Sequence, residues 1–166
     1  MSSLIAIVGT AALLGCALVG GVFFAFSSFV MKALARVPSP EGIATMQSIN
    51  VAVINRSFLG AFVGTALLSA GLGVLAFMNR GHPGTTFFLC GAFFYLAGTF
   101  LVTMLVNVAL NDQLDGISAT DPDAVALWLH YLDRWTLWNH VRTVAAISAV
   151  LLFNFGLMQD SAGIAQ

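Results

Sequence analysis

Residues 85–110 decide the fold, and they read TTFFLCGAFFYLAGTFLVTMLVNVAL. The stretch carries no charged side chain and only scattered polar ones. About 20 apolar residues in helical conformation are enough to cross the hydrocarbon core of a bilayer. Because the stretch is longer than that, it predicts a transmembrane helix.

Three further apolar stretches accompany it, at residues 4–31, 51–78 and 139–158. Of the 166 residues, 59% are apolar and 8% are charged, and the mean hydropathy is +0.94. Soluble domains usually carry about 25% charged residues. We therefore expect an all-α membrane protein, a four-helix transmembrane bundle that forms a single domain over residues 1–166. No Lys or Arg precedes Lys32, which argues for a retained first helix and against a secretory signal peptide.

The connections between the four stretches are unequal. Residues 79–84 form a tight turn, whereas residues 32–39 and 111–120 form longer loops. The longer loops end in the helix-start signals Ser39-Pro40-Glu41 and Asp121-Pro122-Asp123. We therefore expect helices two and four to begin outside the bilayer, at Pro40 and Pro122, and to run into it without a break. Because the pattern occurs twice, it suggests two helical hairpins.

Basic residues near the membrane ends indicate an orientation, since cytoplasmic loops are enriched in Lys and Arg. Apart from Arg80, they lie on the side of the two longer loops. We therefore expect these loops in the cytoplasm and both termini outside it. The net charge of -1, with no basic stripe, argues against a nucleic-acid partner.

Polar and aromatic residues gather at the cytoplasmic ends of the helices. Polar side chains at membrane depth are costly unless they are paired, and they are often functional. We therefore expect one polar pocket at this level. Its expected lining is Gln47, Asn50, Asn55, Asn107, Asn111, Trp138, Asn139 and either His140 or Arg142. Further candidate site residues are Arg56, Tyr131 and Trp135.

Other interpretations apply to parts of this set. Trp135 and Trp138 are also typical of an interfacial aromatic belt, and Asn107 and Asn111 of hydrogen bonds between helices. On a regular helix, Arg142 shares a face with both tryptophans, while His140 lies on the opposite face. A regular helix therefore cannot direct His140 and Arg142 into the same cavity.

Four strings resemble the anthrone oxygenase-like family of small four-helix membrane proteins. They are Gly21-Val-Phe-Phe-Ala-Phe-Ser27, Met46-Gln-Ser-Ile-Asn50 with Asn55 and Phe58, Asn107-Val-Ala-Leu-Asn111-Asp112, and Trp135-Thr-Leu-Trp-Asn-His-Val-Arg142. The resemblance covers nearly the whole chain. It implies a protein of the bacterial inner membrane that oxidises a fused phenolic ketone, an anthrone, to a quinone with O2, without metal or flavin.

For this chain, the resemblance implies a cofactor-independent oxygenase acting on a lipophilic aromatic substrate. His140, Arg142 and Asn139 would be catalytic, and the other candidate residues would bind substrate. His140 would take the ring proton, because imidazole can accept a proton near neutral pH. Asparagine and arginine side chains would stabilise the oxyanion. No H-E-x-x-H, Glu-x-x-His or nucleotide-binding motif is present, so neither a metal nor a cofactor is expected.

The sequence leaves the function open between different classes. The expected partners are the lipid bilayer, a hydrophobic small molecule and O2, with a homo-oligomer left open. The alternative to an oxygenase is a membrane binding or accessory protein that holds a lipid, quinone or haem without catalysis. His130 and His140 are ten residues apart, which is poor spacing on a helix for two ligands of one haem iron.

Overall fold

The computed structural model describes residues 3–163 of the chain, and the side chains of residues 3–159. All regular elements in this part are helical. In chain order they are α1 (Ser3–Ala25), η1 (Phe26–Val30), α2 (Met31–Leu34), α3 (Ser39–Ala52), α4 (Arg56–Met78), α5 (Thr85–Phe93), η2 (Phe94–Leu101), η3 (Thr103–Asn107), α6 (Val108–Asp115) and α7 (Ala124–Gly163).

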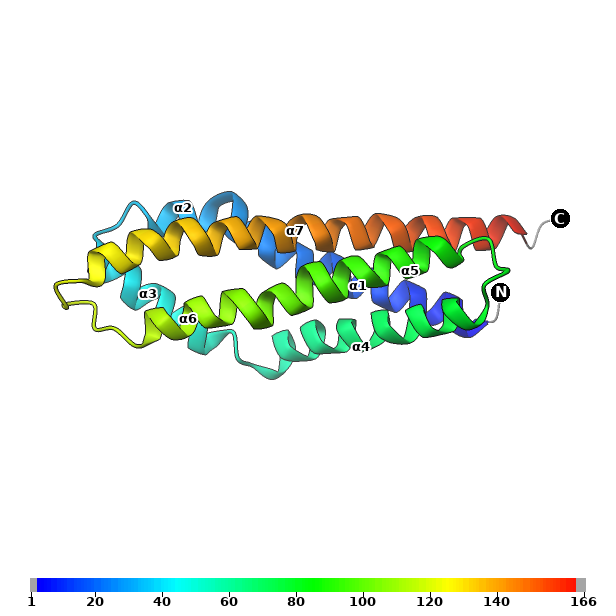
Figure 1. Cartoon of the computed structure of the whole chain (residues 1–166), viewed down its shortest axis with the longest axis horizontal. Coiled ribbons are helices and arrows are strands. Elements are labelled where there is room, and N and C mark those ends of the chain that lie inside the picture. Colours follow the sequence, from blue (N-terminus) through cyan, green and yellow to red (C-terminus); the bar gives the residue numbers. More distant parts are fainter. Residues whose placement is uncertain (1–2, 164–166) are drawn as a thin grey trace.

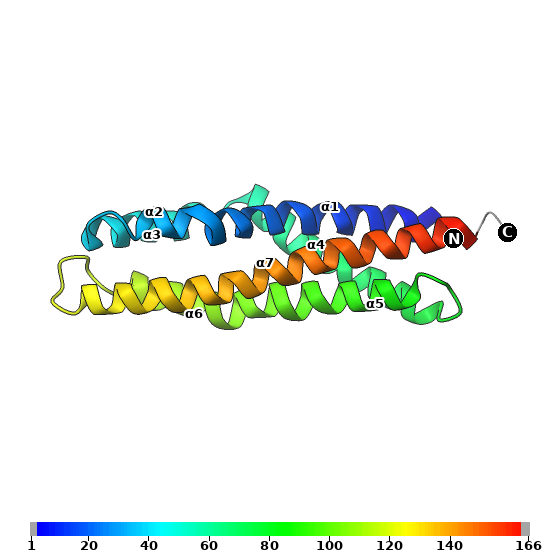
Figure 2. The same ribbon diagram turned by 90° about the horizontal axis from the view of Figure 1, so that it is seen from above.

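Four of the resulting rods are long and apolar enough to cross a membrane: Ser3–Leu34, Arg56–Met78, Thr85–Asp115 and Ala124–Gln159. They lie lengthwise beside one another (Figures 1 and 2). The start of α1, the end of α7 and the turn between α4 and α5 lie at the same end of the bundle. Large apolar side chains such as Leu67 and Leu105 remain about 70% exposed on the outside, where lipid would cover them. The expected four-helix transmembrane bundle is confirmed, and the chain is an integral membrane protein.

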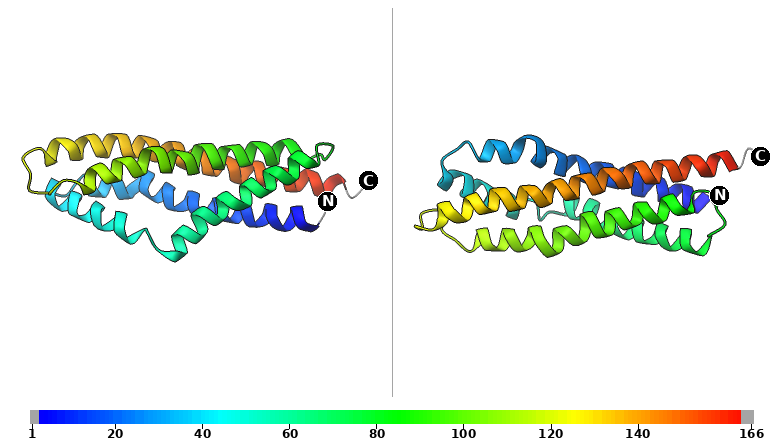
Figure 3. Two further views of the ribbon diagram at one scale, coloured as in Figure 1. Left: turned by 60° about the horizontal axis from the view of Figure 1, so that its bottom comes forward. Right: turned by 45° about the horizontal axis from the view of Figure 1, so that its top comes forward.

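Helix two is not continuous, which corrects the sequence prediction. α3 ends at Ala52, α4 begins at Arg56, and the chain bends sharply between them (Figure 3, left). Asn55 adopts an extended backbone with φ -127° and ψ 161°, and its side-chain oxygen accepts a hydrogen bond from the Phe58 N–H at 2.9 Å. Its amide nitrogen donates to the Ala52 carbonyl at 2.9 Å. The same side chain thus caps both helix ends, which stabilises the break.

Helix four is continuous from Ala124 to Gly163, so it starts two residues after the expected Pro122 and then crosses without a break. Its first turns lie beyond the apolar core and carry a stack of three buried rings. Trp128 and Tyr131 have ring centroids 5.6 Å apart, and Tyr131 and Trp135 6.1 Å apart. This aromatic face packs against α2, α3 and α6 in a second hydrophobic cluster, separate from the cluster within the membrane.

Three segments adopt the wider π-helical turn: η1 in helix one, and η2 and η3 in helix three. π-helical turns inside α-helices frequently occur at functional sites, because the extra residue redirects side chains. Two of the segments, η1 and η3, lie at the level where α3 and α4 bend apart (Figure 1). The bend of helix two and the π-helical segments η1 and η3 therefore occur at one depth of the bundle.

Candidate functional site

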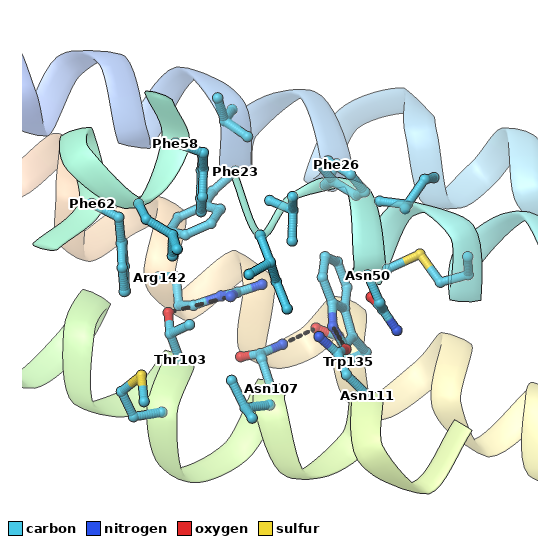
Figure 4. Close-up of a pocket in the computed structure, with 18 of the residues that line it drawn as sticks. Phe23, Phe26, Asn50, Phe58, Phe62, Thr103, Asn107, Asn111, Trp135 and Arg142 are labelled. Atoms are coloured by element: carbon cyan, nitrogen blue, oxygen red, sulfur yellow. Dashed lines mark hydrogen bonds between the residues drawn. The ribbon is translucent and has the colours of Figure 1, made fainter. Parts of the chain in front are cut away.

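A cavity of about 310 Å³ lies at this depth, between the two hydrophobic clusters. Helix one, the bend of helix two, η3 with α6, and α7 all contribute to its wall (Figure 4). The lining consists of Val22, Phe23, Phe26, Met46, Ile49, Asn50, Val53, Ile54, Phe58, Leu59, Phe62, Thr103, Met104, Asn107, Val108, Asn111, Asp112, Asp115, Trp135 and Arg142. Small-molecule sites are typically concave, mostly apolar and fitted with a few polar groups, as this one is.

Aromatic rings form much of the apolar wall. Phe58 and Phe62 are stacked with centroids 5.9 Å apart and an interplanar angle of 7°. Phe23 meets the edge of Phe62 at 6.4 Å, and Phe26 is tilted against Trp135 at 5.5 Å. Such ring faces and edges favour contact with another planar aromatic group. The wall therefore suits a flat, apolar ligand.

Arg142 places a guanidinium group against this wall although its side chain is only 3% exposed. One terminal nitrogen donates to the Asn139 Oδ1 atom at 2.7 Å, and the other donates to the Thr103 hydroxyl at 3.3 Å. The Cζ atom lies 4.2 Å from the centroid of the Phe23 ring and 4.9 Å from that of Trp135. These contacts hold the cation in one position by hydrogen bonds and by cation–π attraction.

Asn139 fixes Arg142 from behind and does not line the cavity itself. Its side chain is fully buried, and its amide nitrogen donates to the Phe23 carbonyl and to the Ser27 hydroxyl, both at 2.7 Å. The Ser27 hydroxyl in turn lies 3.1 Å from that of Thr143. Asn139 therefore links helix one to the guanidinium of helix four, and it holds two residues of the cavity lining, Phe23 and Arg142.

The two asparagines of helix three differ in how their side-chain oxygens are satisfied. The Asn111 Oδ1 atom accepts hydrogen bonds from the Tyr131 hydroxyl at 2.9 Å and from the Trp135 indole N–H at 2.8 Å. The Asn107 amide nitrogen donates to the Trp135 carbonyl at 3.2 Å, but its buried Oδ1 atom has no partner. Asn111 therefore holds Tyr131 and Trp135 in place, while the Oδ1 atom of Asn107 accepts no hydrogen bond (Figure 4).

The outer part of the cavity combines a polar and an apolar border. Asp112 and Asp115 are exposed and contribute to the lining, and the Asn50 amide nitrogen donates to an Asp115 carboxylate oxygen at 3.3 Å. Ile54, in the break between α3 and α4, is 70% exposed, and Met104, on η3, is 48% exposed. The cavity thus has an exposed carboxylate border and an exposed apolar border.

The predicted site residues fall into three groups. Asn50, Asn107, Asn111, Trp135 and Arg142 line the cavity, whereas Asn139 and Tyr131 bond directly to side chains that line it. The remaining members of the set lie elsewhere: Gln47, Asn55, Arg56, Trp138 and His140.

Gln47, Asn55, Arg56 and Trp138 have identifiable surroundings outside the cavity. The Gln47 amide nitrogen donates to the carbonyls of Leu114 and Ile117, at 2.8 and 3.0 Å, and so fastens α3 to the end of helix three. Asn55 is the helix cap described above. Arg56 is exposed and Trp138 is half-buried.

His140 is exposed and lines a different, apolar groove together with Phe93, Phe94 and Gly98. Arg142, two residues further along the same continuous helix, lines the cavity. The divergence of the two side chains is that of a regular helix. Catalysis by His140 stays a prediction, and its position gives it no contact with the cavity.

Sequence reasoning missed the aromatic wall, Thr103 and the two carboxylates. Thr103 carried a signal, because it lies four residues before Asn107 and hence on the same helix face. Phe23, Phe26 and Phe58 occur in the strings that resemble the family, but hydropathy and spacing do not distinguish them from the other apolar residues of a transmembrane segment. No group of three or more His, Cys, Asp or Glu placed to hold a metal ion occurs in the part of the chain that the structure describes.

The fold and the cavity define a class: a four-helix integral membrane protein with an aromatic cavity and a buried arginine at one end of its spans. The family model described as Anthrone oxygenase matches residues 52–152. The chain belongs to this family. The match contains the walls contributed by α4, η3, α6 and α7, but not those contributed by α1 and α3. No curated protein and no solved structure matches the chain.

Proposed function

We propose that the protein oxidises a lipophilic, anthrone-like aromatic ketone with O2 inside the membrane-level cavity. The observation that carries this proposal is the buried Arg142 guanidinium in an aromatic wall, in a chain of the anthrone oxygenase family. The reaction converts a ring methylene to a carbonyl. Both C–H bonds of that carbon break, one oxygen atom of O2 becomes the carbonyl oxygen, and the other leaves as water with the two hydrogens.

The cavity supplies what such a reaction requires from the protein. Loss of a methylene proton gives an enolate, whose negative oxygen is stabilised by a fixed cation or hydrogen-bond donor. Arg142 is that group, held in place by Asn139 and Thr103. The enolate passes an electron to O2, the two radicals combine to a peroxide on the ring carbon, and loss of water gives the ketone. The rings of Phe23, Phe58 and Phe62 keep the reacting atoms apart from bulk water.

The apolar border of the cavity supports entry of the substrate from the bilayer. Ile54 and Met104 are exposed where lipid chains would lie, so a hydrophobic ligand can pass between them without crossing water. O2 also dissolves well in the hydrocarbon region. The proton removed from the substrate has a path to water past Asp112 and Asp115, on the other border.

The orientation in the membrane belongs to the same proposal. We place the long loops in the cytoplasm and both termini outside, in a bacterial inner membrane, because of the basic bias of these loops. Labelling of Ser118→Cys and Gly81→Cys in intact cells, in a background without the exposed Cys90, tests this. Gly81 is suitable because a Cβ atom there meets nothing within 4 Å. Labelling of Ser118→Cys from outside would refute the orientation.

The function is tested by O2 uptake of the purified protein in lipid nanodiscs with an anthrone as substrate. Arg142→Gln should lower kcat by about 10²–10³-fold, the effect of removing one oxyanion-stabilising donor. Arg134→Gln is the matched control, since it makes the same change at an exposed position of the same helix. Binding of the anthrone without O2 uptake would replace the oxygenase by the alternative, a protein that holds its ligand without catalysis.

A further inference from the structure

Arg142 is a buried cation without an anion. Its hydrogen-bond partners, the Asn139 amide and the Thr103 hydroxyl, are both neutral, and its Nε atom has no hydrogen-bond partner at all. The two rings that face the guanidinium, Phe23 and Trp135, are neutral as well. Within the described residues, no carboxylate forms an ion pair with Arg142.

Such an arrangement is energetically incomplete. A buried charge is strongly unfavourable unless an opposite charge or sufficient hydrogen bonds compensate it, and more so at membrane depth. Cation–π contacts with Phe23 and Trp135 compensate only part of the cost. The nearest carboxylates that share the cavity, Asp112 and Asp115, are exposed at its border, and Asp115 is bonded to Asn50. Within the described residues, the protein itself therefore supplies no counter-anion in contact with Arg142.

A second unpartnered atom belongs to the same wall. The buried Oδ1 atom of Asn107, on the helix opposite Arg142, accepts no hydrogen bond. Few buried polar atoms in native structures lack a partner, and those that do require an explanation. Figure 4 shows the two side chains converging on the interior of the cavity from α7 and η3. A bound group carrying both an oxyanion and a neighbouring hydroxyl would complete Arg142 and Asn107 together.

We propose that the cavity binds its substrate as an anion, the conjugate base of an acidic phenol or enol, with Arg142 as the counter-cation. The ligand's O–H bond breaks on binding, its electron pair stays on oxygen, and the proton passes to water at the carboxylate border. The inference rests on the proposed function only in identifying this anion with the substrate. When the ligand is the enol, its conjugate base is already the enolate of the proposed reaction, so no further base is needed inside the cavity. The cavity lining contains neither histidine nor lysine, and its carboxylates, Asp112 and Asp115, lie at the outer border.

The test uses a hydroxyanthraquinone, which has the planar ring system but is already a quinone and consumes no O2. Its neutral phenol is yellow and its phenolate is red, so the absorption spectrum reports the charge of the bound ligand. We expect the protein in phosphatidylcholine nanodiscs to raise the phenol's ionisation constant by about 10- to 1,000-fold, as a cation at contact distance does. Empty nanodiscs of the same lipid give the baseline.

Variants of the protein and a probe that cannot ionise show whether Arg142 causes the shift in the ionisation constant. Arg142→Gln should abolish the shift, Arg142→Lys should keep part of it, and Arg134→Gln, exposed on the same helix, should keep all of it. The methyl ether of the probe cannot ionise, so its unchanged binding to Arg142→Gln shows that the cavity is still folded. Should Arg142→Gln fail to fold, the wild-type protein alone decides, since bound probe that stays yellow would overturn the proposal.

A lipid phosphate has the same anionic oxygen chemistry and is the other source of a counter-anion. Phosphatidylcholine carries a phosphodiester as well, so the titration is repeated in dodecyl maltoside micelles, which contain no phosphate, with and without added phosphatidylglycerol. An unchanged shift supports a planar organic anion, whereas loss of the shift assigns Arg142 to lipid phosphate and refutes the inference. The proposed function is judged separately: phenolate binding without O2 uptake from an anthrone refutes the function alone, and O2 uptake with a yellow probe refutes the inference alone.

Discussion

Asn139→Ala removes the side chain that fixes Arg142, at a residue that does not itself line the cavity. Asn139 makes three hydrogen bonds through its side chain: it donates to the Phe23 carbonyl and to the Ser27 hydroxyl, and it accepts from Arg142, each at 2.7 Å. The alanine variant leaves the guanidinium with the long 3.3 Å bond to Thr103 as its remaining hydrogen bond. Both the stability of the bundle and the position of the cation should therefore suffer.

The loss in stability can be bounded from these contacts. Hydrogen bonds between membrane helices contribute about 0.6 kcal/mol each on average, which gives about 1 kcal/mol for the two bonds from Asn139 to helix one. The bond with Arg142 lies within α7 and adds about 1 kcal/mol if it counts as an ordinary hydrogen bond. A hydrogen bond to a charged group is worth about 1.5–3 kcal/mol, which raises the total to about 4 kcal/mol if the guanidinium bond has its full value. We therefore expect Asn139→Ala to lower the free energy of unfolding by about 2–4 kcal/mol.

Reversible unfolding in mixed micelles with an increasing share of dodecyl sulfate measures this free energy. The matched control is Asn154→Ala, which removes an exposed asparagine from the same helix and should stay within about 0.5 kcal/mol of wild type. Equal losses in the two variants would refute the idea that Asn139 links helix one to helix four. A second readout isolates the positioning role: the folded fraction of Asn139→Ala should show a lower kcat than Asn154→Ala.

Three further changes test the cap, the candidate base and the packing. His140→Ala should lower turnover by less than about tenfold, because the side chain lies outside the cavity; a loss of about 10²–10⁴-fold would instead support its role as a general base. Asn55→Ala should cost about 1 kcal/mol in the same unfolding assay through loss of the helix cap, while Asn55→Asp retains the acceptor and should cost less; the reverse order would contradict the cap. Gly91→Ala places a Cβ atom 2.5 Å from the Phe153 ring and should cost about 1–3 kcal/mol, whereas Gly64→Ala meets nothing within 4 Å and should cost nothing.

The four spans could be predicted because length and hydropathy alone decide whether a helix crosses a bilayer. The break in helix two could not. The residues that follow the end of α3, Val53 to Asn55, lie at the start of an apolar run. A polar segment before a transmembrane helix has the same sequence pattern whether it continues straight into the helix or bends. The decisive interaction is the Asn55 side chain bonding to Phe58 and Ala52, a local choice that competes with helix continuation.

The depth of the site could also be predicted, since polar residues near the ends of four antiparallel spans must come to one level. The direction of each side chain depends on packing. The periodicity of a regular helix placed Arg142 and His140 on opposite faces. The structure agrees, because α7 is a regular helix there. In helix three, the π-helical turns of η2 and η3 change the angular relation of residues on either side of them. The spacing of Asn107 and Asn111 in the sequence therefore could not predict which of the two has a side-chain oxygen without a hydrogen-bond donor.

The cavity owes its existence to the same departures from regularity. α4 packs against α5 and η2, while α3 packs against α6 and α7, so the two halves of helix two follow different neighbours. Between the two halves, at Val53 and Ile54, helix two diverges from helix three. On the opposite side of the cavity, helix three adopts the wider π-helical turn of η3. A straight helix two would pack along η3 and fill this space with side chains, as close packing elsewhere in the bundle does. Arg142 then would have neither room for an anion nor a path for one, so the bend at Asn55 and the uncompensated charge of Arg142 are two parts of one site.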